Sequence, residues 1–184
     1  MVTGISIADL AVLGIASGGP VGANRIATVA KALVPEHWQP TVCVITAGIE
    51  RNLSAGLLRH RKDHLSDEQF TLTAEGNAKF RALLLCSPEA LAPSAILAAE
   101  AIQFCFLDYT DASTAKTVLL RFQENLRCRL TSCEQRSAKC RQSGRYKNFW
   151  LEMEQHRLKS MASFLAAVSD ETAGAEVSHT LDPV

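Results

Sequence analysis

The densest run of basic side chains in the first half of the chain lies between residues 59 and 64, and its chemistry suits phosphate contact. Its members are Arg59, His60, Arg61, Lys62 and His64. Lysine and arginine neutralise nucleic-acid phosphates, although a solvated hairpin tip is the alternative explanation for such a run. Because Arg59 and Arg61 share strand parity, we expect both side chains to point the same way. We favour phosphate contact.

A helix expected just before this run carries polar side chains that suit base edges. Val44, Ile45 and Ile49 are predicted to form its buried stripe, and Thr41 is expected to cap its first turn. Threonine and arginine can donate to phosphates or bases, although a purely capping Thr41 and a merely solvated Arg51 are the alternative. The residues that we expect to contact DNA are Arg25, Lys31, Gln39, Thr41, Thr46, Arg51, Arg59, His60, Arg61 and Lys62.

The pattern does not favour other chemistry. His60 and His64 are four residues apart, a spacing that places two metal ligands together on a helix but not on the hairpin expected here. No pair among the six cysteines has Cys-x-x-Cys spacing, and the sequence lacks a glycine-rich phosphate loop, a nucleophile elbow and a His-Glu-x-x-His motif. We therefore expect no enzyme activity, no metal and no cofactor.

These residues need a small domain that presents one helix and one hairpin outward. The predicted elements are helices over residues 5–17, 21–33 and 41–52, a hairpin of strands at 57–61 and 69–72, and a fourth helix over 73–85 with Thr73 as its cap. Together they predict an N-terminal winged helix-turn-helix domain over residues 1–86, with three to four helices and a two-stranded β wing.

The second half predicts a mainly helical dimerisation domain over residues 87–168. Its helices are expected over 88–107, 112–142 and 146–168, arranged antiparallel, with 169–184 as a disordered tail. Large apolar residues recur every three or four positions, as in coiled-coil packing, and a second copy is the expected partner. The predicted dimer interface contains Leu119, Phe122, Leu126, Leu130, Cys133, Trp150, Met153, Met161 and Leu165.

Several segments in the same order resemble the PadR family of bacterial transcriptional regulators, in its longer form with a C-terminal helical domain. The matching segments are 10–15 followed by Gly19-Pro20, then 38–41, 56–58 and 70–76. The chain departs from the family where Gly22-Ala23 replaces a Gly-Tyr pair, Thr46 replaces a tyrosine and Asn52 replaces a leucine. The resemblance implies a winged helix-turn-helix regulator that binds double-stranded DNA.

The resemblance also implies a small-molecule effector, held in some regulators of this family where the two domains meet. Aromatic residues that can line such a pocket are Trp38, Phe122, Tyr146 and Trp150. Packing in a core or a dimer interface is the alternative for each of them, because large aromatic residues at helical spacing are usually packed.

The bulk composition limits the class of protein. With 184 residues, 47% of them hydrophobic and 21% charged, the chain has enough apolar material for a core. It contains neither an uncharged run long enough to span a bilayer nor a secretory signal, so we expect a cytoplasmic protein without membrane contact. Its formal net charge is zero, so any DNA-binding surface must come from local clustering of basic residues.

The leading hypothesis is a homodimeric, sequence-specific transcriptional regulator, a repressor relieved by a small-molecule ligand. The first alternative is a winged-helix module that binds another protein and has weak or no DNA binding; the zero net charge and the changed residues of the third helix motivate it. The second alternative is a thiol redox sensor, because Cys133 and Cys140 share the predicted seam, although buried cysteines usually only pack.

Overall fold

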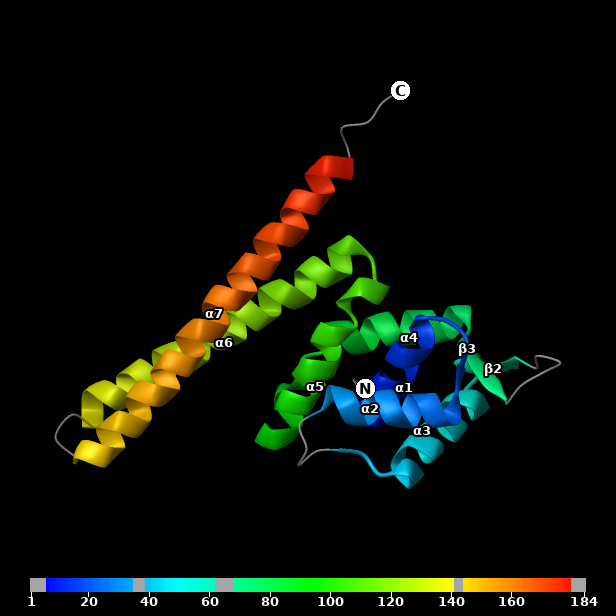
Figure 1. The fold of residues 1–184 in the computed structure, drawn as a ribbon, viewed down its shortest axis with the longest axis horizontal. Coiled ribbons are helices and arrows are strands. Elements are labelled where there is room, and N and C mark those ends of the chain that lie inside the picture. Colours follow the sequence, from blue (N-terminus) through cyan, green and yellow to red (C-terminus); the bar gives the residue numbers. More distant parts are fainter. Residues whose placement is uncertain (1–5, 35–38, 62–67, 141–143, 180–184) are drawn as a thin grey trace. The chain divides into compact units, whose positions relative to one another are not determined.

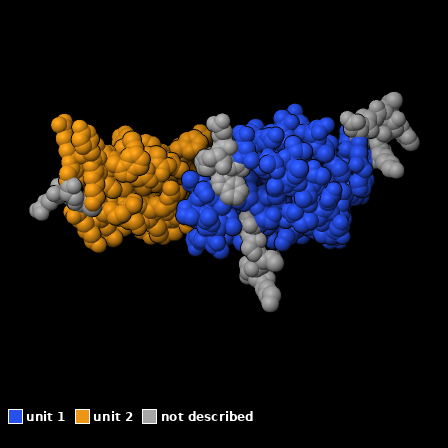
Figure 2. Space-filling model, turned by 90° about the horizontal axis from the view of Figure 1, so that it is seen from below, with its two compact units in different colours: residues 1–118 blue, residues 119–184 orange. Residues whose placement is uncertain are grey.

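The structure is a computed structural model that describes residues 6–34, 39–61, 68–140 and 144–179 (Figure 1). It divides into two compact units, Met1–Val118 and Leu119–Val184, coloured separately in Figure 2. The chain passes from the first unit to the second within helix α6. Helices and a small antiparallel sheet make up the fold, which confirms the predicted fold class.

Helix α1, Ile7–Ser17, is the centre of the first unit. The helix begins at its cap Ser6, whose hydroxyl accepts a hydrogen bond from the backbone N–H of Asp9 at 3.3 Å. Residues 10–14 and Ala16 are buried, so α1 is covered nearly all round, as expected for a helix that is apolar on every side. Helices α2, Ala23–Leu33, and α3, Val42–Ser54, both pack on it (Figure 1).

A three-stranded antiparallel sheet adjoins these helices. Its strands are β1 (Val21–Gly22), β2 (Leu58–Arg61) and β3 (Gln69–Leu72), in the order β1-β3-β2. The predicted hairpin is therefore confirmed, but the sequence analysis missed β1 and started the second helix two residues too early. Val21 pairs with Phe70, and a pairing of two residues leaves no periodicity in the sequence by which to find it.

Helix α4, Ala74–Leu85, follows the sheet and starts at the predicted cap. The Thr73 hydroxyl accepts from the N–H of Gly76 at 3.0 Å and donates to the carbonyl oxygen of Gly56 at 2.7 Å. This hydroxyl therefore ties the start of α4 to the turn that precedes β2. The same corner brings the Leu57 carbonyl oxygen against Gly76, where a β-carbon would collide with backbone.

The first unit continues well past residue 86, the predicted domain boundary. After a 3-10 turn at Pro88–Ala90, helix α5, Pro93–Cys105, packs on α1 and α2, and a second 3-10 turn follows at Leu107–Tyr109. Gln103 is fully buried, and its Nε2 donates to the carbonyl oxygens of Leu83, Leu84 and Cys86 at 2.9–3.2 Å. This side chain joins α5 to the end of α4, so α5 belongs to the N-terminal core.

The second unit is an antiparallel pair formed by most of α6, Ala112–Cys140, and by α7, Arg145–His179 (Figure 1). Leu119, Phe122, Leu126 and Cys133 of the predicted dimer seam are buried here. Helix α7 of the same chain lies against this side of α6: Cys133 Sγ is 3.8 Å from the Leu151 carbonyl oxygen, and Gln123 donates to the Leu165 carbonyl and the Ser169 hydroxyl. The inner face of α7 contributes Leu151, Leu158 and Leu165.

This packing corrects the sequence analysis, which assigned that α6 seam to a second copy. The α6 stripe is already covered by α7 within one chain. The predicted last helix is confirmed and extends to His179, so residues 169–179 are helical where we expected a disordered tail. That stretch contains alanine and glutamate, which favour helix, and no proline. Residues 180–184 lie outside the described residues.

Replacing Gly76 with alanine tests the tight corner between β2 and α4. Because the new β-carbon would meet the Leu57 carbonyl, which is backbone and cannot rotate away, we expect Gly76→Ala to lower the free energy of unfolding by about 1–3 kcal/mol. The exposed neighbour Asn77→Ala is the control and should stay within about 0.5 kcal/mol in urea denaturation. Equal stability of the two variants would contradict the close approach.

Candidate nucleic-acid interface

Helix α3 presents one face outward and buries the other on α1 and α2. It begins at the predicted cap Thr41, whose hydroxyl accepts from the N–H of Val44 at 3.4 Å. Its buried residues are Ile45, Gly48, Ile49 and Asn52. Val44 is 47% exposed, so its assignment to the buried stripe is wrong. The observed stripe follows the spacing i, i+3, i+4, i+7, which Val44 does not fit.

The outer face of α3 carries mostly small or medium-sized side chains and is nearly uncharged. Its exposed residues in the first two turns are Val42, Cys43, Val44 and Thr46, followed by Glu50 and Arg51. Thr46, predicted to contact DNA, is exposed on this face. One acidic and one basic residue leave α3 without net charge, so attraction to phosphates must come from other elements.

Arg51, the basic residue of α3, is held by an acidic residue of α1. Its guanidinium donates to Asp9 Oδ1 at 2.7 Å. The same oxygen accepts from Asn52 Nδ2 at 3.1 Å, and Nδ2 also donates to the carbonyl oxygen of Gly48 at 2.7 Å. Asn52 is only 3% exposed, whereas the side chains of Asp9 and Arg51 are 23% and 54% exposed, so this hydrogen-bonded group extends from the buried contact between α1 and α3 to the surface.

The group explains an oddity of the sequence. Asn52 replaces the leucine found at this position in the family that the sequence resembles. Its buried amide donates hydrogen bonds to Asp9 Oδ1 and to the Gly48 carbonyl oxygen, so it is not left without a partner. Sequence reasoning missed Asp9 because it lies about forty positions earlier in the chain, and only the packing of α1 on α3 brings the two together. The one available signal was the polar residue itself on an otherwise apolar stripe.

The hairpin of β2 and β3 supplies the basic residues that α3 lacks. Arg59 pairs with Thr71 and Arg61 with Gln69, which puts both arginines on the same face of the sheet, as predicted. Both are exposed, and Arg59 Nε donates to the Thr71 hydroxyl at 3.2 Å, which steadies that side chain. Thus two arginines from alternate positions form a short basic row.

His60 lies on the opposite face of β2. Its Nδ1 is 2.7 Å from Glu68 Oε1, and its ring centroid is 5.4 Å from that of Phe70. The structure therefore does not bring His60 together with Arg59 and Arg61. Lys62 and His64 lie outside the described residues. Among the residues that the structure does describe, no group of three or more His, Cys, Asp or Glu side chains is placed to hold a metal ion.

The remaining predicted DNA contacts lie on α2 and on the segment before α3. Arg25 is exposed near the start of α2, Lys31 is half-buried near its end, and Gln39 is exposed. Trp38, predicted as a wall of an effector pocket, lies outside the described residues. The other predicted pocket residues are separated, because Phe122 is buried between α6 and α7 whereas Tyr146 and Trp150 are 85% and 64% exposed.

The predicted seam cysteines do not favour redox sensing. Cys133 is fully buried, and its thiol lies 3.8 Å from the Leu151 carbonyl oxygen, as in packing. The side chain of Cys140 is outside the described part of the chain. Cys43 and Cys128 are exposed, the first on the outer face of α3.

The arrangement of α2, α3 and the hairpin defines the first unit as a winged helix-turn-helix. No protein-family model and no curated protein matches the sequence. Solved structures similar to the chain include PadR of Bacillus subtilis with p-coumaric acid, at 17% identity, 91% coverage of this chain, 96% of that chain and a TM-score of 0.40.

Two further similar structures are regulators of the same kind. PadR of Bacillus subtilis in complex with operator DNA has 16% identity, covers 91% of this chain and 99% of that chain, and has a TM-score of 0.39. A PadR-like transcriptional regulator from Bacillus cereus has 14% identity, covers 92% and 99%, and has a TM-score of 0.41. No helix in the described ranges is both long and apolar enough to cross a membrane.

A double-mutant cycle tests the partly buried hydrogen bond between Asp9 and Asn52. We expect the effects of Asp9→Ala and Asn52→Ala on the free energy of unfolding to be non-additive by about 1 kcal/mol, since each removes the partner of the other. Chemical denaturation of the four proteins measures this coupling. The control cycle combines Asp9→Ala with Thr46→Ala, a substitution of an exposed residue on the same helix. In this cycle the two changes in the free energy of unfolding should be additive. Additive effects in both cycles would rule out the link.

Proposed function

We propose that this chain is a homodimeric, sequence-specific DNA-binding transcriptional regulator that acts as a repressor. The observation that carries the proposal is the exposed outer face of α3 next to a hairpin with Arg59 and Arg61 on one face. Such a helix reads base edges in the major groove while basic residues beside it hold phosphates. Occupation of a promoter by two such units blocks transcription.

Affinity and specificity fall to different elements in this proposal. The wing arginines supply phosphate contacts, which are independent of sequence. Helix α3 supplies the reading surface, where the Thr46 methyl suits the thymine methyl group and its hydroxyl suits a base edge, while Glu50 can accept from a cytosine amine. Arg51 is paired with Asp9, which offsets its charge, so it contributes little to the initial attraction. Its remaining guanidinium N–H groups can still donate to a phosphate or base.

The outer face of α7 is the surface that we assign to dimerisation. Its large exposed apolar residues recur at helical spacing and are Tyr146, Phe149, Trp150, Met153, Met161 and Phe164. Trp150, Met153 and Met161 belong to the interface predicted from sequence. An apolar stripe of this length on a helix is usually covered by a partner. A second copy is the fitting partner because the two-fold repeat of an operator needs two reading helices.

Selection of genomic fragments by the purified chain tests DNA binding and yields the operator. We expect enrichment of a two-fold symmetric site, and an affinity for it that falls steeply with salt. Replacing Arg59 and Arg61 together with alanine should weaken binding to every sequence and flatten the log–log salt slope by about 1.8 per protomer, because two phosphate contacts are lost.

Fluorescence anisotropy with the selected operator measures this effect. Arg127→Ala, which removes an arginine on α6 that is paired with Glu124, is the matched control and should leave the slope unchanged. If the salt slope of the Arg59 and Arg61 double variant is unaltered, these arginines do not contact the phosphates.

Replacing Trp150 and Met153 with serine tests the dimer surface. We expect the variant to sediment as a monomer and to lose most of its operator affinity, because burial of the α7 stripe is what holds the two copies together. Leu120→Ser, a change of another large exposed residue (56% exposed) on α6, should leave the dimer intact. A dimer that persists in the double variant contradicts this surface.

A second candidate function is a winged-helix module that binds another protein. The observation that favours it is the nearly uncharged outer face of α3, where Arg51 is already paired with Asp9. The fragment selection separates the two candidates. The protein-binding module is supported if no DNA fragments are enriched and if any residual affinity of the chain for DNA does not change with salt concentration.

A further inference from the structure

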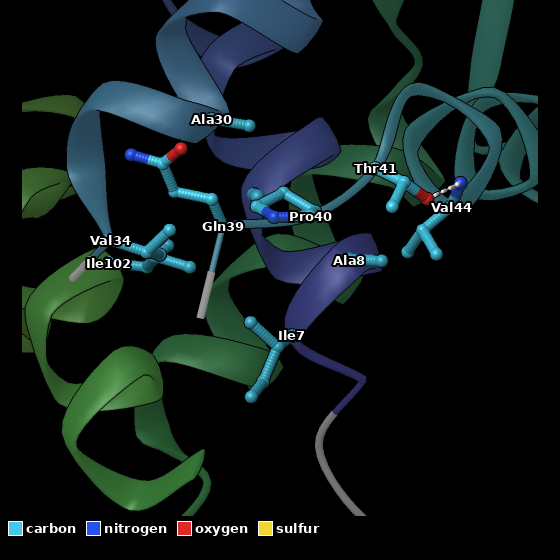
Figure 3. Close-up of a pocket in the computed structure, with 10 residues that line it drawn as sticks. Ile7, Ala8, Ala30, Val34, Gln39, Pro40, Thr41, Val44 and Ile102 are labelled. Atoms are coloured by element: carbon cyan, nitrogen blue, oxygen red, sulfur yellow. Dashed lines mark hydrogen bonds between the residues drawn. The ribbon is translucent and has the colours of Figure 1, made fainter. Parts of the chain in front are cut away.

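A pocket of about 370 Å³ lies in the first unit beside the start of α3 (Figure 3). Its walls come from α1, α2, α3 and α5 together with the segment that leads into α3, so residues distant in sequence meet there. Ala8 of α1 and Val44 of α3 line it, as does Ile102 of α5. Its volume is within the range of pockets that bind small molecules.

The lining restricts the chemistry of an occupant. None of the described residues that line the pocket carries a charge, and most are apolar. The polar side chains are Gln39 and Thr41, and the Thr41 hydroxyl already accepts from the N–H of Val44. The described lining therefore offers no counter-charge to a carboxylate or ammonium group, while its apolar side chains suit an apolar one. A neutral, largely apolar molecule with one polar group within reach of Gln39 is the matching ligand.

The position of the pocket links an occupant to the reading helix. Thr41 and Val44 form the first turn of α3, and Val44 is a 47% exposed apolar side chain on the pocket wall. A bound molecule would contact this turn on one side and α1 on the other. It would therefore favour whichever placement of α3 best accommodates it.

We propose that this pocket binds a neutral, apolar small molecule, and that binding changes the affinity for DNA through the first turn of α3. The effect on DNA rests on the function proposed above, whereas the binding itself does not. Among the described residues, the site shares none with the aromatic set expected from sequence, since Phe122, Tyr146 and Trp150 lie on α6 and α7. Trp38 lies outside the described residues.

Calorimetric titration of the full chain with 2-naphthol and 2-naphthoate tests the ligand class. These probes have the same ring system, and at neutral pH the first is uncharged while the second is an anion. We expect saturable binding of one naphthol per chain and at least about tenfold weaker binding of naphthoate. Equal affinities, or no saturable binding of naphthol, would overturn the proposal.

Two exposed valines of α3 provide a matched pair of variants. Val44 lines the pocket and Val42 does not, yet both are about half exposed, so a charge at either site is compatible with folding. Val44→Asp should weaken naphthol binding at least about tenfold, whereas Val42→Asp should leave it unchanged. Ala8→Phe, which fills the pocket, should abolish binding, with the exposed Ala78→Phe on α4 as its control. If the two variants of either pair change naphthol affinity equally, naphthol binds at a site other than this pocket.

The outer face of α7 is the alternative binding place for an aromatic probe. The Trp150→Ser and Met153→Ser double variant should bind naphthol as the parent chain does, and loss of binding there would overturn the assignment to the pocket.

The proposed effect of the ligand on DNA binding is tested separately, by measuring operator affinity with and without saturating naphthol. The proposed effect on DNA is supported if naphthol changes the operator affinity of the parent chain but not that of Val44→Asp. If naphthol leaves the operator affinity of the parent chain unchanged, the effect on DNA is ruled out, while the evidence that the pocket binds naphthol is unaffected.

Discussion

The packing of α3 on α1 is the constraint on which the rest of the first unit depends. Helix α1 is buried nearly all round, and α3 approaches it closely at Gly48, where a β-carbon would lie 3.3 Å from a Val12 methyl group. A side chain at that position would require Val12 to shift by a few tenths of an ångström. The close approach fixes which residues of α3 face inward, and therefore which residues remain to meet another molecule.

The same contact determines the charge of the outward face. Because α3 and α1 meet where Asp9 lies, the carboxylate neutralises Arg51 and satisfies the buried amide of Asn52. Satisfied hydrogen bonds of this kind hold the two helices in one arrangement. The cost is an α3 face with little attraction for phosphates, and the basic row of Arg59 and Arg61 on β2 offsets that lack.

The second unit shows how one stripe of apolar residues can be satisfied within a chain. The inner faces of α6 and α7 cover each other through Leu126, Cys133 and Leu158, among others. What stays uncovered is the opposite side of α7, with Trp150 and Met153. Helix α7 therefore has two distinct faces, one packed against α6 within the chain and one on which large apolar side chains are exposed.

The local elements follow from the order of residues: helix positions from apolar spacing, the caps Thr41 and Thr73, and the parity that puts Arg59 and Arg61 on one face. These features depend on neighbours a few residues away, which the sequence displays directly. Long-range packing instead places Asp9 against Arg51, adds β1 to the sheet, joins α5 to the first unit and turns the α6 seam toward α7 of the same chain. Each of these depends on which apolar surfaces meet across long stretches of chain, and apolar periodicity marks a surface for burial without naming its partner.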